Sequence, residues 1–302
     1  MTDHLLADQN APSVPAPAML VALLDGSLVS SSAPLLRPDD AGVARGDGIF
    51  ETTLVVNRVP RDLPEHLGRM AVSAAMTEID LPDHAGWQRG VDAVLGAWTG
   101  AAGTGAPAAD MVLRLIATRG PEHGRPTCFV TGAAVSPAAI RQRTEGVRVL
   151  LLDRGLSGPA AAAAPWLLAG AKTLSYAINM AALRYAAARQ ADDVIFVGSD
   201  GAILEAPTAT VVVVRDGTLL TPPLEGVLAG ITVDRLFRAA GSAGWTTAHQ
   251  RLTPEDLSTA DGVWLASSVR LLAPVVGIDG VPRDDDEGLT EKMLGLLDFP
   301  LR

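Results

Sequence analysis

The 302-residue chain combines 48% hydrophobic with 19% charged residues, which excludes an intrinsically disordered protein and supplies enough apolar side chains for one large core or two ordinary ones. Its 24 basic and 34 acidic residues give a net charge of −10, so we expect no general affinity for nucleic acid or for an anionic membrane. A local phosphate site stays open, because such a site needs only one or two Arg.

The first part of the chain alternates strand and helix patterns. Residues 1–17 are polar and then rich in Pro and Ala, which predicts a disordered tail. Apolar or β-branched runs bounded by turn residues predict strands at 19–24, 27–30, 49–56, 111–118 and 127–134. Apolar residues at helical spacing predict helices from residue 64 to 81, where Pro opens the first turn, and over 86–98.

The polar, basic segment 137–146 separates this part from a second one. Strands are predicted at 147–152, 194–197, 202–204, 210–214, 218–220, 263–266 and 275–278, and helices at 174–189, 230–240 and 289–297. Hairpins with interspersed helices predict an α+β fold and argue against a doubly wound parallel sheet. We therefore predict two α+β domains, at residues 18–140 and 147–302.

The compartment and several kinds of site follow from what the sequence lacks. Cys128 is the single Cys, which excludes an intrachain disulfide framework and a multi-Cys metal site. The five His never fall at metal-ligand spacing, so we expect no protein-held metal. No run reaches the roughly 18 consecutive apolar residues of a membrane helix, and no basic residue precedes Arg37. These features predict a cytoplasmic protein without a membrane partner.

The chain has two Lys among its 24 basic residues, and they differ in surroundings. Lys292 lies in an acidic terminal helix, which indicates a surface charge. Lys172 follows the uncharged stretch 165–171 and precedes apolar positions of a predicted helix, so we expect a partly desolvated ammonium. Desolvation lowers the pKa of a Lys and frees its amine as a nucleophile, which Arg cannot become. The alternative is a Lys with a buried stem and a hydrated ammonium.

Three further features are candidates for binding. Glu205 follows a predicted hairpin in apolar surroundings, where a carboxylate needs a cationic or N–H partner. The protonated pyridine nitrogen of pyridoxal phosphate is one such partner, and an Arg is the alternative. Residues 230–232 begin a helix, whose N-terminus can bind an anion. Arg69 lies on an apolar helix, where it is either a ligand-binding side chain or one that extends to water.

Five segments, in this order, resemble the class IV pyridoxal-phosphate enzymes, which include branched-chain and D-amino acid aminotransferases and 4-amino-4-deoxychorismate lyase. The segments are Arg-Gly-Asp-Gly-Ile-Phe-Glu-Thr at 45–52, His-Leu-x-Arg-Met-x-x-Ser-Ala at 66–74, Lys172 with Tyr176 and Asn179, Glu205, and Gly-Ile-Thr at 230–232. The resemblance spans about residues 19–280. It implies a fold-type-IV protein of two α+β domains with the cofactor between them, assembled as a homodimer.

The resemblance also implies roles for single residues. Lys172 would hold pyridoxal 5'-phosphate covalently and move protons at the reacting carbon, and Glu205 would keep the pyridine nitrogen protonated. The cofactor's phosphate would be bound by Arg69, Ile231, Thr232 and Ser268. Many relatives follow the Glu with Ser-Asn or Ala-Asn, whereas Ala206 and Pro207 follow it here, so the hydroxyl network around the cofactor differs.

Four segments (153–156, 171–179, 193–197 and 264–270) look most like aminodeoxychorismate lyases of actinobacteria. This resemblance implies a small-molecule substrate, 4-amino-4-deoxychorismate, which is converted to pyruvate and to the folate precursor 4-aminobenzoate. Arg114 and Arg270 are candidates for the substrate carboxylates, or else form structural ion pairs. Ser267 takes the place of a catalytic Asn of the enterobacterial lyase. D-amino acid or branched-chain aminotransferase activity is the alternative, because it uses the same residues.

Overall fold

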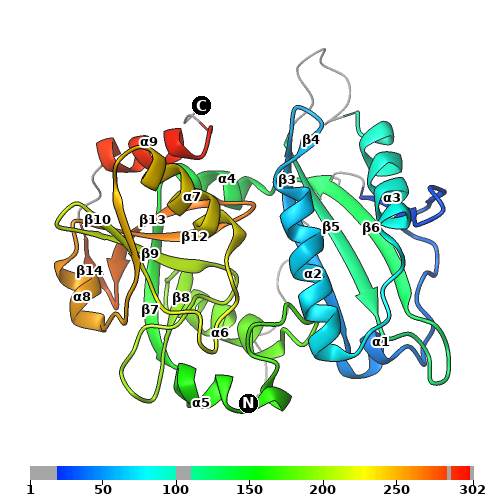
Figure 1. Ribbon diagram of the computed structural model, residues 1–302, viewed down its shortest axis with the longest axis horizontal. Coiled ribbons are helices and arrows are strands. Elements are labelled where there is room, and N and C mark those ends of the chain that lie inside the picture. Colours follow the sequence, from blue (N-terminus) through cyan, green and yellow to red (C-terminus); the bar gives the residue numbers. More distant parts are fainter. Residues whose placement is uncertain (1–18, 100–109, 284–286, 300–302) are drawn as a thin grey trace, which may run out of the picture.

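The protein consists of two halves that lie side by side, each built on its own β-sheet (Figure 1). The computed structural model describes residues 19–99, 110–283 and 287–299, so the tail predicted at 1–17 lies outside the described residues. Helices and mostly antiparallel strands are mixed in both halves, which confirms the α+β class. Within the described residues, no helix has both the length and the apolar composition that crossing a bilayer requires.

The first sheet has six strands in the order β2-β1-β6-β5-β3-β4, and all its neighbours are antiparallel. Its strands are β1 (Leu20–Leu23), β2 (Leu28–Val29), β3 (Gly48–Val56), β4 (Val59–Pro60), β5 (Met111–Thr118) and β6 (Thr127–Ala134). The helices of this half are α1 (Ala41–Arg45), α2 (Leu63–Thr77) and α3 (His84–Ala97). Helices α2 and α3 pack against one face of the sheet, where Met70, Trp87 and Leu113 share a core.

Helix α2 carries polar as well as apolar residues on its buried face. Pro64 occupies its first turn, as the sequence predicts, and Glu78 ends it in a left-handed conformation with φ of 54°. Met70 belongs to the core, while His66 and Ser73 are buried nearby. Buried polar side chains need hydrogen-bond partners, so this face of α2 is a place to look for a site.

The second sheet has the order β11-β10-β9-β12-β13-β7-β8, with β14 paired to β13. Its strands are β7 (Val147–Asp153), β8 (Asp193–Val197), β9 (Thr210–Arg215), β10 (Thr218–Thr221), β11 (Thr246–His249), β12 (Gly262–Ser267), β13 (Leu271–Ile278) and β14 (Val281–Pro282). Its helices are α4 (Pro137–Thr144), α5 (Gly158–Ala162), the 3-10 helix η1 (Pro165–Leu167), α6 (Ala177–Ala187), α7 (Ile231–Ser242), α8 (Pro254–Thr259) and α9 (Glu287–Leu296). The pairs β10–β11, β13–β7 and β7–β8 are parallel, and the others are antiparallel.

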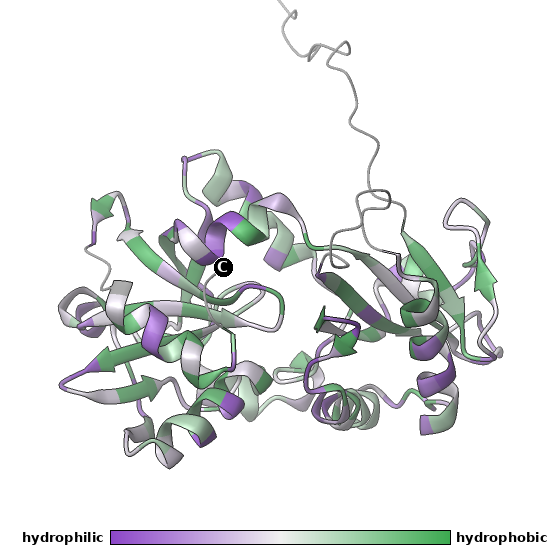
Figure 2. Ribbon diagram, turned by 90° about the horizontal axis from the view of Figure 1, so that it is seen from above, coloured by the Kyte–Doolittle hydropathy of each residue, from purple (hydrophilic) through white to green (hydrophobic). Residues whose placement is uncertain are grey.

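Helices cover both faces of the second sheet. Leu236 of α7 and Leu294 of α9 pack on one face, and Leu257 of α8 packs on the other. The first of these cores also contains Leu54 of β3, so apolar packing continues from one half into the other. Seen from above, the strands of both halves are largely coloured hydrophobic (Figure 2).

The segment 137–146, which the sequence predicts only as a polar separator, contains helix α4. Ser136 accepts a hydrogen bond from the Ala139 N–H and so caps this helix, and Pro137 occupies its first turn. The helix therefore forms from local signals although half of its residues are polar.

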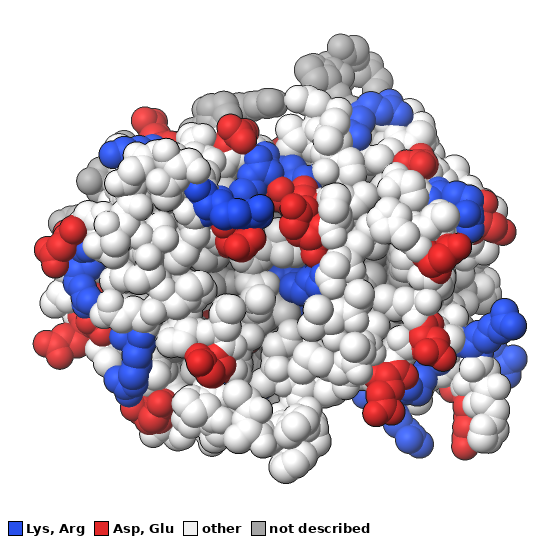
Figure 3. Space-filling view, viewed as in Figure 1, with Lys and Arg blue, Asp and Glu red and all other residues white. Residues whose placement is uncertain are grey.

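The surface is hollowed where the two halves meet, and basic and acidic side chains lie along this junction (Figure 3). One contact across the junction is the ion pair between Arg235 of α7 and Asp62, with N and O 2.6 Å apart. The candidate residues of both halves must be sought around this boundary.

Candidate active site

Lys172 is attached through its backbone to a strand of the first half. The Phe50 N–H donates to the Lys172 carbonyl at 3.0 Å, and the Leu174 N–H donates to the Gly48 carbonyl at 2.8 Å. The Lys172 N–H donates to the Ser73 hydroxyl at 3.0 Å. Because residues 172–174 pair with β3, helix α6 begins at Ala177, three residues later than the sequence predicts. Lys172 therefore lies in an extended segment before the helix.

The amine of Lys172 has an aromatic and partly buried environment. Its Nζ donates to the Tyr176 hydroxyl at 3.1 Å and lies 4.6 Å from the centre of the Phe50 ring. Burial lowers the pKa of Lys172 to about 8, and the positive charge of Arg69 contributes to the same shift. About a tenth of such amines is neutral at pH 7, compared with a negligible fraction for an ordinary Lys. The prediction of a desolvated amine at this position agrees with the structure.

Glu205 is electrostatically coupled to the Lys172 amine, although it has no salt-bridge partner among the described residues. Residues 202–205 run along β8 as predicted, since the Phe196 N–H donates to the Glu205 carbonyl at 2.8 Å. The Glu205 carboxylate accepts a 3.1 Å hydrogen bond from the Leu228 N–H. Burial raises the pKa of Glu205 to about 7, although this N–H and the charge of Lys172 oppose the shift. No salt bridge to Glu205 occurs among the described residues, so it can accept a ligand's N–H.

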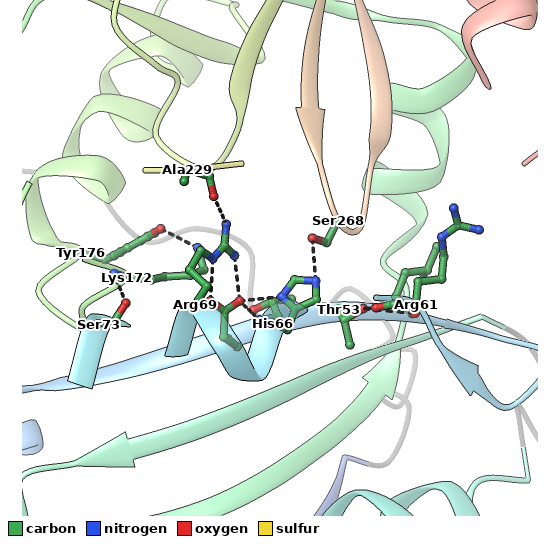
Figure 4. Close-up of polar contacts among 12 residues, drawn as sticks. Thr53, Arg61, His66, Arg69, Ser73, Lys172, Tyr176, Ala229 and Ser268 are labelled. Atoms are coloured by element: carbon green, nitrogen blue, oxygen red, sulfur yellow. Dashed lines mark hydrogen bonds and ion pairs between the residues drawn. The ribbon is translucent and has the colours of Figure 1, made fainter. Parts of the chain in front are cut away.

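Arg69 is at the centre of a polar network that the sequence reasoning only partly found (Figure 4). Its Nε and Nη2 donate to the Glu51 carboxylate at 2.7 and 2.8 Å, and its Nη1 donates to the Ala229 carbonyl at 2.7 Å. His66 Nδ1 lies 2.7 Å from Glu51, and its Nε2 lies 3.2 Å from the Ser268 hydroxyl. Arg69 and Ser268 are therefore connected through two buried residues.

The N-terminus of α7 lies next to this network. Ala229, which accepts from Arg69, is two residues before Ile231, the first residue of the helix. The first N–H groups of a helix have no partner within it, and Gly230 provides no side-chain cap. The Ile231 and Thr232 N–H groups are thus available to an anion at a helix terminus, where the dipole favours negative charge.

The three candidate substrate residues differ in position. Arg114 pairs in register with Thr52, and its side chain is exposed on the opposite face of the sheet from Leu113. Arg270 is 7% exposed and donates to the buried Asp193 carboxylate at 2.6 Å, which favours a structural ion pair over a role in substrate binding. The Ser267 hydroxyl accepts from the Arg270 N–H at 3.3 Å.

Glu51 and His66 are the functional residues that the sequence reasoning missed. Both belong to matched segments, but neither was given a role. Glu51 is a lone carboxylate within the apolar strand pattern of residues 49–56, and a buried carboxylate requires a partner. The need of a buried carboxylate for a partner is therefore the signal by which the sequence could identify Glu51. Among residues 19–99, 110–283 and 287–299, no group of three or more His, Cys, Asp or Glu is arranged to hold a metal ion.

Together these groups suit a phosphorylated pyridine aldehyde. Arg69, Ser268 and the start of α7 can bind the phosphate, the Glu205 carboxylate can accept a ring N–H, and the Lys172 amine can react with the aldehyde. The fit rests on two features of the described residues: the first N–H groups of α7, at Ile231 and Thr232, have no side-chain cap, and the Glu205 carboxylate, whose pKa burial raises, has no salt bridge.

Comparisons with known proteins support the same conclusion. A family model described as amino-transferase class IV matches residues 48–278. A bifunctional aminodeoxychorismate lyase and D-amino acid transaminase of Mycobacterium tuberculosis is 41% identical over 86% of this chain and 92% of its own length. A solved structure described as a hypothetical aminotransferase of the same organism, in its form bound to pyridoxal phosphate, is 40% identical with a TM-score of 0.87, over 93% of this chain and 97% of its own.

A more distant structure also matches along most of its length. It is the 4-amino-4-deoxychorismate lyase of Pseudomonas aeruginosa, 26% identical with a TM-score of 0.73, over 92% of this chain and 97% of that one. These matches extend through both halves of the structure and all the candidate residues from Arg69 to Ser268. The chain therefore belongs to the class IV aminotransferase family, with the fold type IV that its two halves form.

Proposed function

We propose that the protein is a pyridoxal-phosphate-dependent lyase that converts 4-amino-4-deoxychorismate to 4-aminobenzoate and pyruvate. The observation that carries the proposal is the placement of the Lys172 amine, with a pKa lowered to about 8, beside the charges of Arg69 and Glu205. The bifunctional mycobacterial relative supports the choice of substrate, because it is 41% identical along nearly its whole length.

Different residues would bind the phosphate and the ring nitrogen of the cofactor. Arg69, the Ile231 and Thr232 N–H groups and the Ser268 hydroxyl would bind the cofactor's phosphate. Glu205 would hold the pyridine nitrogen in its protonated form. When bound, pyridoxal phosphate supplies an electron sink for the substrate carbon that loses a proton. A carboxylate with a pKa of about 7 suits this role, since it can share a proton with the ring nitrogen near neutral pH.

Lys172 would act twice. Its amine would first hold the aldehyde carbon of the cofactor and then, once the substrate's amine has replaced it, take the proton from the substrate ring carbon. The enolpyruvyl group would then leave with the electrons of its bond to the ring, which makes the ring aromatic, and the proton taken by Lys172 would pass to it to give pyruvate. The Tyr176 hydroxyl, 3.1 Å from Nζ, would orient the free amine, and its pKa, raised to about 12 by burial and then by Glu205, keeps it protonated.

D-amino acid transamination is the second candidate. The same Lys172 and Glu205 would serve it, and the mycobacterial relative's name carries both activities. Branched-chain transamination is a weaker alternative, supported by a putative archaeal aminotransferase of Methanocaldococcus jannaschii at 28% identity.

An assay of the purified protein with each substrate class tests the proposal. Incubation with 4-amino-4-deoxychorismate should yield 4-aminobenzoate, and D-alanine with 2-oxoglutarate should yield pyruvate only if the second activity is present. Lys172→Ala should abolish both, whereas Lys292→Ala should retain them, because Lys292 belongs to helix α9 and its ammonium lies over the Trp245 ring. Transamination without 4-aminobenzoate would contradict the lyase assignment.

The assembly and compartment remain part of the proposal. A homodimer is supported by apolar side chains exposed on η1 and α6, among them Trp166 at 79% exposure, Ile178 and Tyr185. Light scattering on the purified protein should give twice the chain mass. The free Cys128 is compatible with the reducing cytoplasm. The division into domains at 18–140 and 147–302 is supported by the strands, since no sheet in the described residues mixes strands from the two ranges.

A further inference from the structure

Two ionisable side chains are fully buried beneath the proposed phosphate site. Glu51 of β3 is 0% exposed and His66 of α2 is 1% exposed. The proposed reaction uses neither of them. Burying such groups is unfavourable unless they are paired, so their position requires an explanation.

Glu51 fixes the orientation of Arg69. Burial alone would raise the pKa of Glu51, but hydrogen bonds from Arg69 and His66 outweigh burial and lower it to about 2. The carboxylate is therefore ionised, and it holds the guanidinium by two parallel bonds of 2.7 and 2.8 Å. A two-point grip on a planar group leaves it little rotational freedom.

The two hydrogen bonds to Glu51 leave some N–H donors of the Arg69 guanidinium for a ligand. A guanidinium has five N–H donors. In the part of the chain that the structure describes, two bind Glu51 and one binds the Ala229 carbonyl, so two remain. Because Nη1 donates to the Ala229 carbonyl, two residues before Ile231, the guanidinium lies close to the N-terminus of helix α7.

His66 connects Glu51 to the hydroxyl of Ser268. An ionised carboxylate can only accept, so His66 Nδ1 donates to Glu51 across 2.7 Å. This fixes the ring, and its Nε2 then lies 3.2 Å from the Ser268 hydroxyl, which belongs to the other half of the protein. Figure 4 shows Arg69, His66 and Ser268 in a row, with the contact from His66 to Ser268 drawn as a dashed line.

We infer that Glu51 is a positioning residue for the cofactor's phosphate: it orients Arg69 directly and Ser268 through His66, so that both halves of the protein contribute to one anion site. The inference rests on the proposed assignment of the phosphate to Arg69, Ile231, Thr232 and Ser268. It adds a role for two residues that do not themselves touch the ligand.

The test compares two ligands that differ only in the phosphate, pyridoxal 5'-phosphate and pyridoxal, by equilibrium dialysis against the full-length apoprotein. Glu51→Gln keeps the shape but loses the charged acceptor, so the affinity for pyridoxal phosphate should fall about 30-fold, as for a lost charged hydrogen bond. The affinity for pyridoxal should change less than about twofold. Equal losses for both ligands would indicate a general structural role and would overturn the inference.

Asp40→Asn is the matched control. Asp40 is also a 0% exposed carboxylate of the first half, and it accepts from Thr118 and Thr127 away from the site. This variant should leave the ratio of the two affinities unchanged. If it shifts the ratio as much as Glu51→Gln does, the positioning role of Glu51 is refuted.

A double-mutant cycle covers the case in which Glu51→Gln does not fold. If His66 acts through Ser268, then His66→Gln and Ser268→Ala together should weaken pyridoxal phosphate no more than the stronger single change. Additive losses would overturn the relay. Arg69→Met distinguishes the phosphate site itself from the positioning role of Glu51. If Arg69→Met is the only variant that lowers the preference for pyridoxal phosphate over pyridoxal, the role of Glu51 is refuted and the phosphate site is kept. If no variant lowers this preference, the role of Glu51 and the phosphate site are both refuted.

Discussion

The Phe50 N–H donates a 3.0 Å hydrogen bond to the carbonyl of Lys172, so the candidate reactive lysine of the second half is attached to a strand of the first. Next to it, Ile49 and Thr173 form an antiparallel bridge. The position of the amine is thus set by strand pairing across the boundary between the halves, and it does not depend on helix α6 alone.

This attachment requires a small residue at Gly48. A Cβ at that position would lie 2.6 Å from Leu174 Cδ1 and 2.8 Å from the Ala117 carbonyl oxygen. We expect Gly48→Ala to displace residues 172–174 and to lower kcat more than tenfold, since small displacements of a reacting group are costly. Steady-state kinetics with the preferred substrate would check this. Gly68→Ala, on α2 with no atom within 4 Å of the new Cβ, should retain activity and gain roughly 0.5–1 kcal/mol of stability.

Glu205 should make the stability of the apoprotein depend on pH. Its pKa rises from 4.5 in the unfolded chain to about 7 in the folded one, so the unfolded chain binds fewer protons between these values. Stability should therefore fall as pH rises from 4.5 to 7, by about 3 kcal/mol for this group. Urea unfolding of Glu205→Gln should lack this decrease and show a more stable protein at pH 7. A variant that follows the wild-type curve would show that Glu205 is not desolvated.

Lys172 should contribute a rise in the stability of the apoprotein with pH, in a higher pH range than Glu205. Burial lowers its pKa from 10.5 to about 8, so the unfolded chain binds more protons between these values, and stability should rise over that interval. The difference in unfolding free energy between the wild-type apoprotein and Lys172→Met should rise from pH 8 to pH 10, and taking this difference cancels the opposing contributions of Cys128 and Tyr176, whose pKa values burial raises to about 12. Lys292→Met is the control, because it removes the other Lys and leaves the rise in place.

Arg270 is expected to matter for folding more than for substrate binding. Removing it leaves the Asp193 carboxylate buried without its 2.6 Å partner, which should cost about 3–5 kcal/mol of unfolding free energy. The double variant Arg270→Met/Asp193→Asn should recover most of that loss, as urea titrations would reveal. A large rise in KM at unchanged stability would instead assign Arg270 to a substrate carboxylate.

Arg114 is expected to matter for substrate binding more than for folding. Its side chain is exposed, it makes no ion pair among the described residues, and its positive charge contributes to lowering the pKa of Lys172. Arg114→Gln should raise KM for a carboxylate substrate about tenfold, within the range for a lost charged hydrogen bond, and leave the melting temperature unchanged. Parallel kinetics and thermal unfolding would decide whether this holds.

The sequence allowed the fold class and most of the candidate site to be predicted, because both depend on local patterns. Hydrophobic periodicity located most elements, and the isolation of Lys172 and Glu205 in apolar stretches identified them as unusual. The start of α6 was misplaced, since helix periodicity at 174 does not reveal that this segment pairs with β3. The partners of Glu51 and Arg270 could not be predicted, because they come from elements distant in the chain.

The most direct test of the central claim is to locate the cofactor on the chain. The protein contains two lysines, so borohydride reduction of the pyridoxal-phosphate-loaded protein, followed by peptide mass mapping, distinguishes them cleanly. We predict a phosphopyridoxyl label on the peptide that contains Lys172 and none on the peptide that contains Lys292. A label confined to Lys292, or no label on a protein that binds the cofactor, would contradict the account.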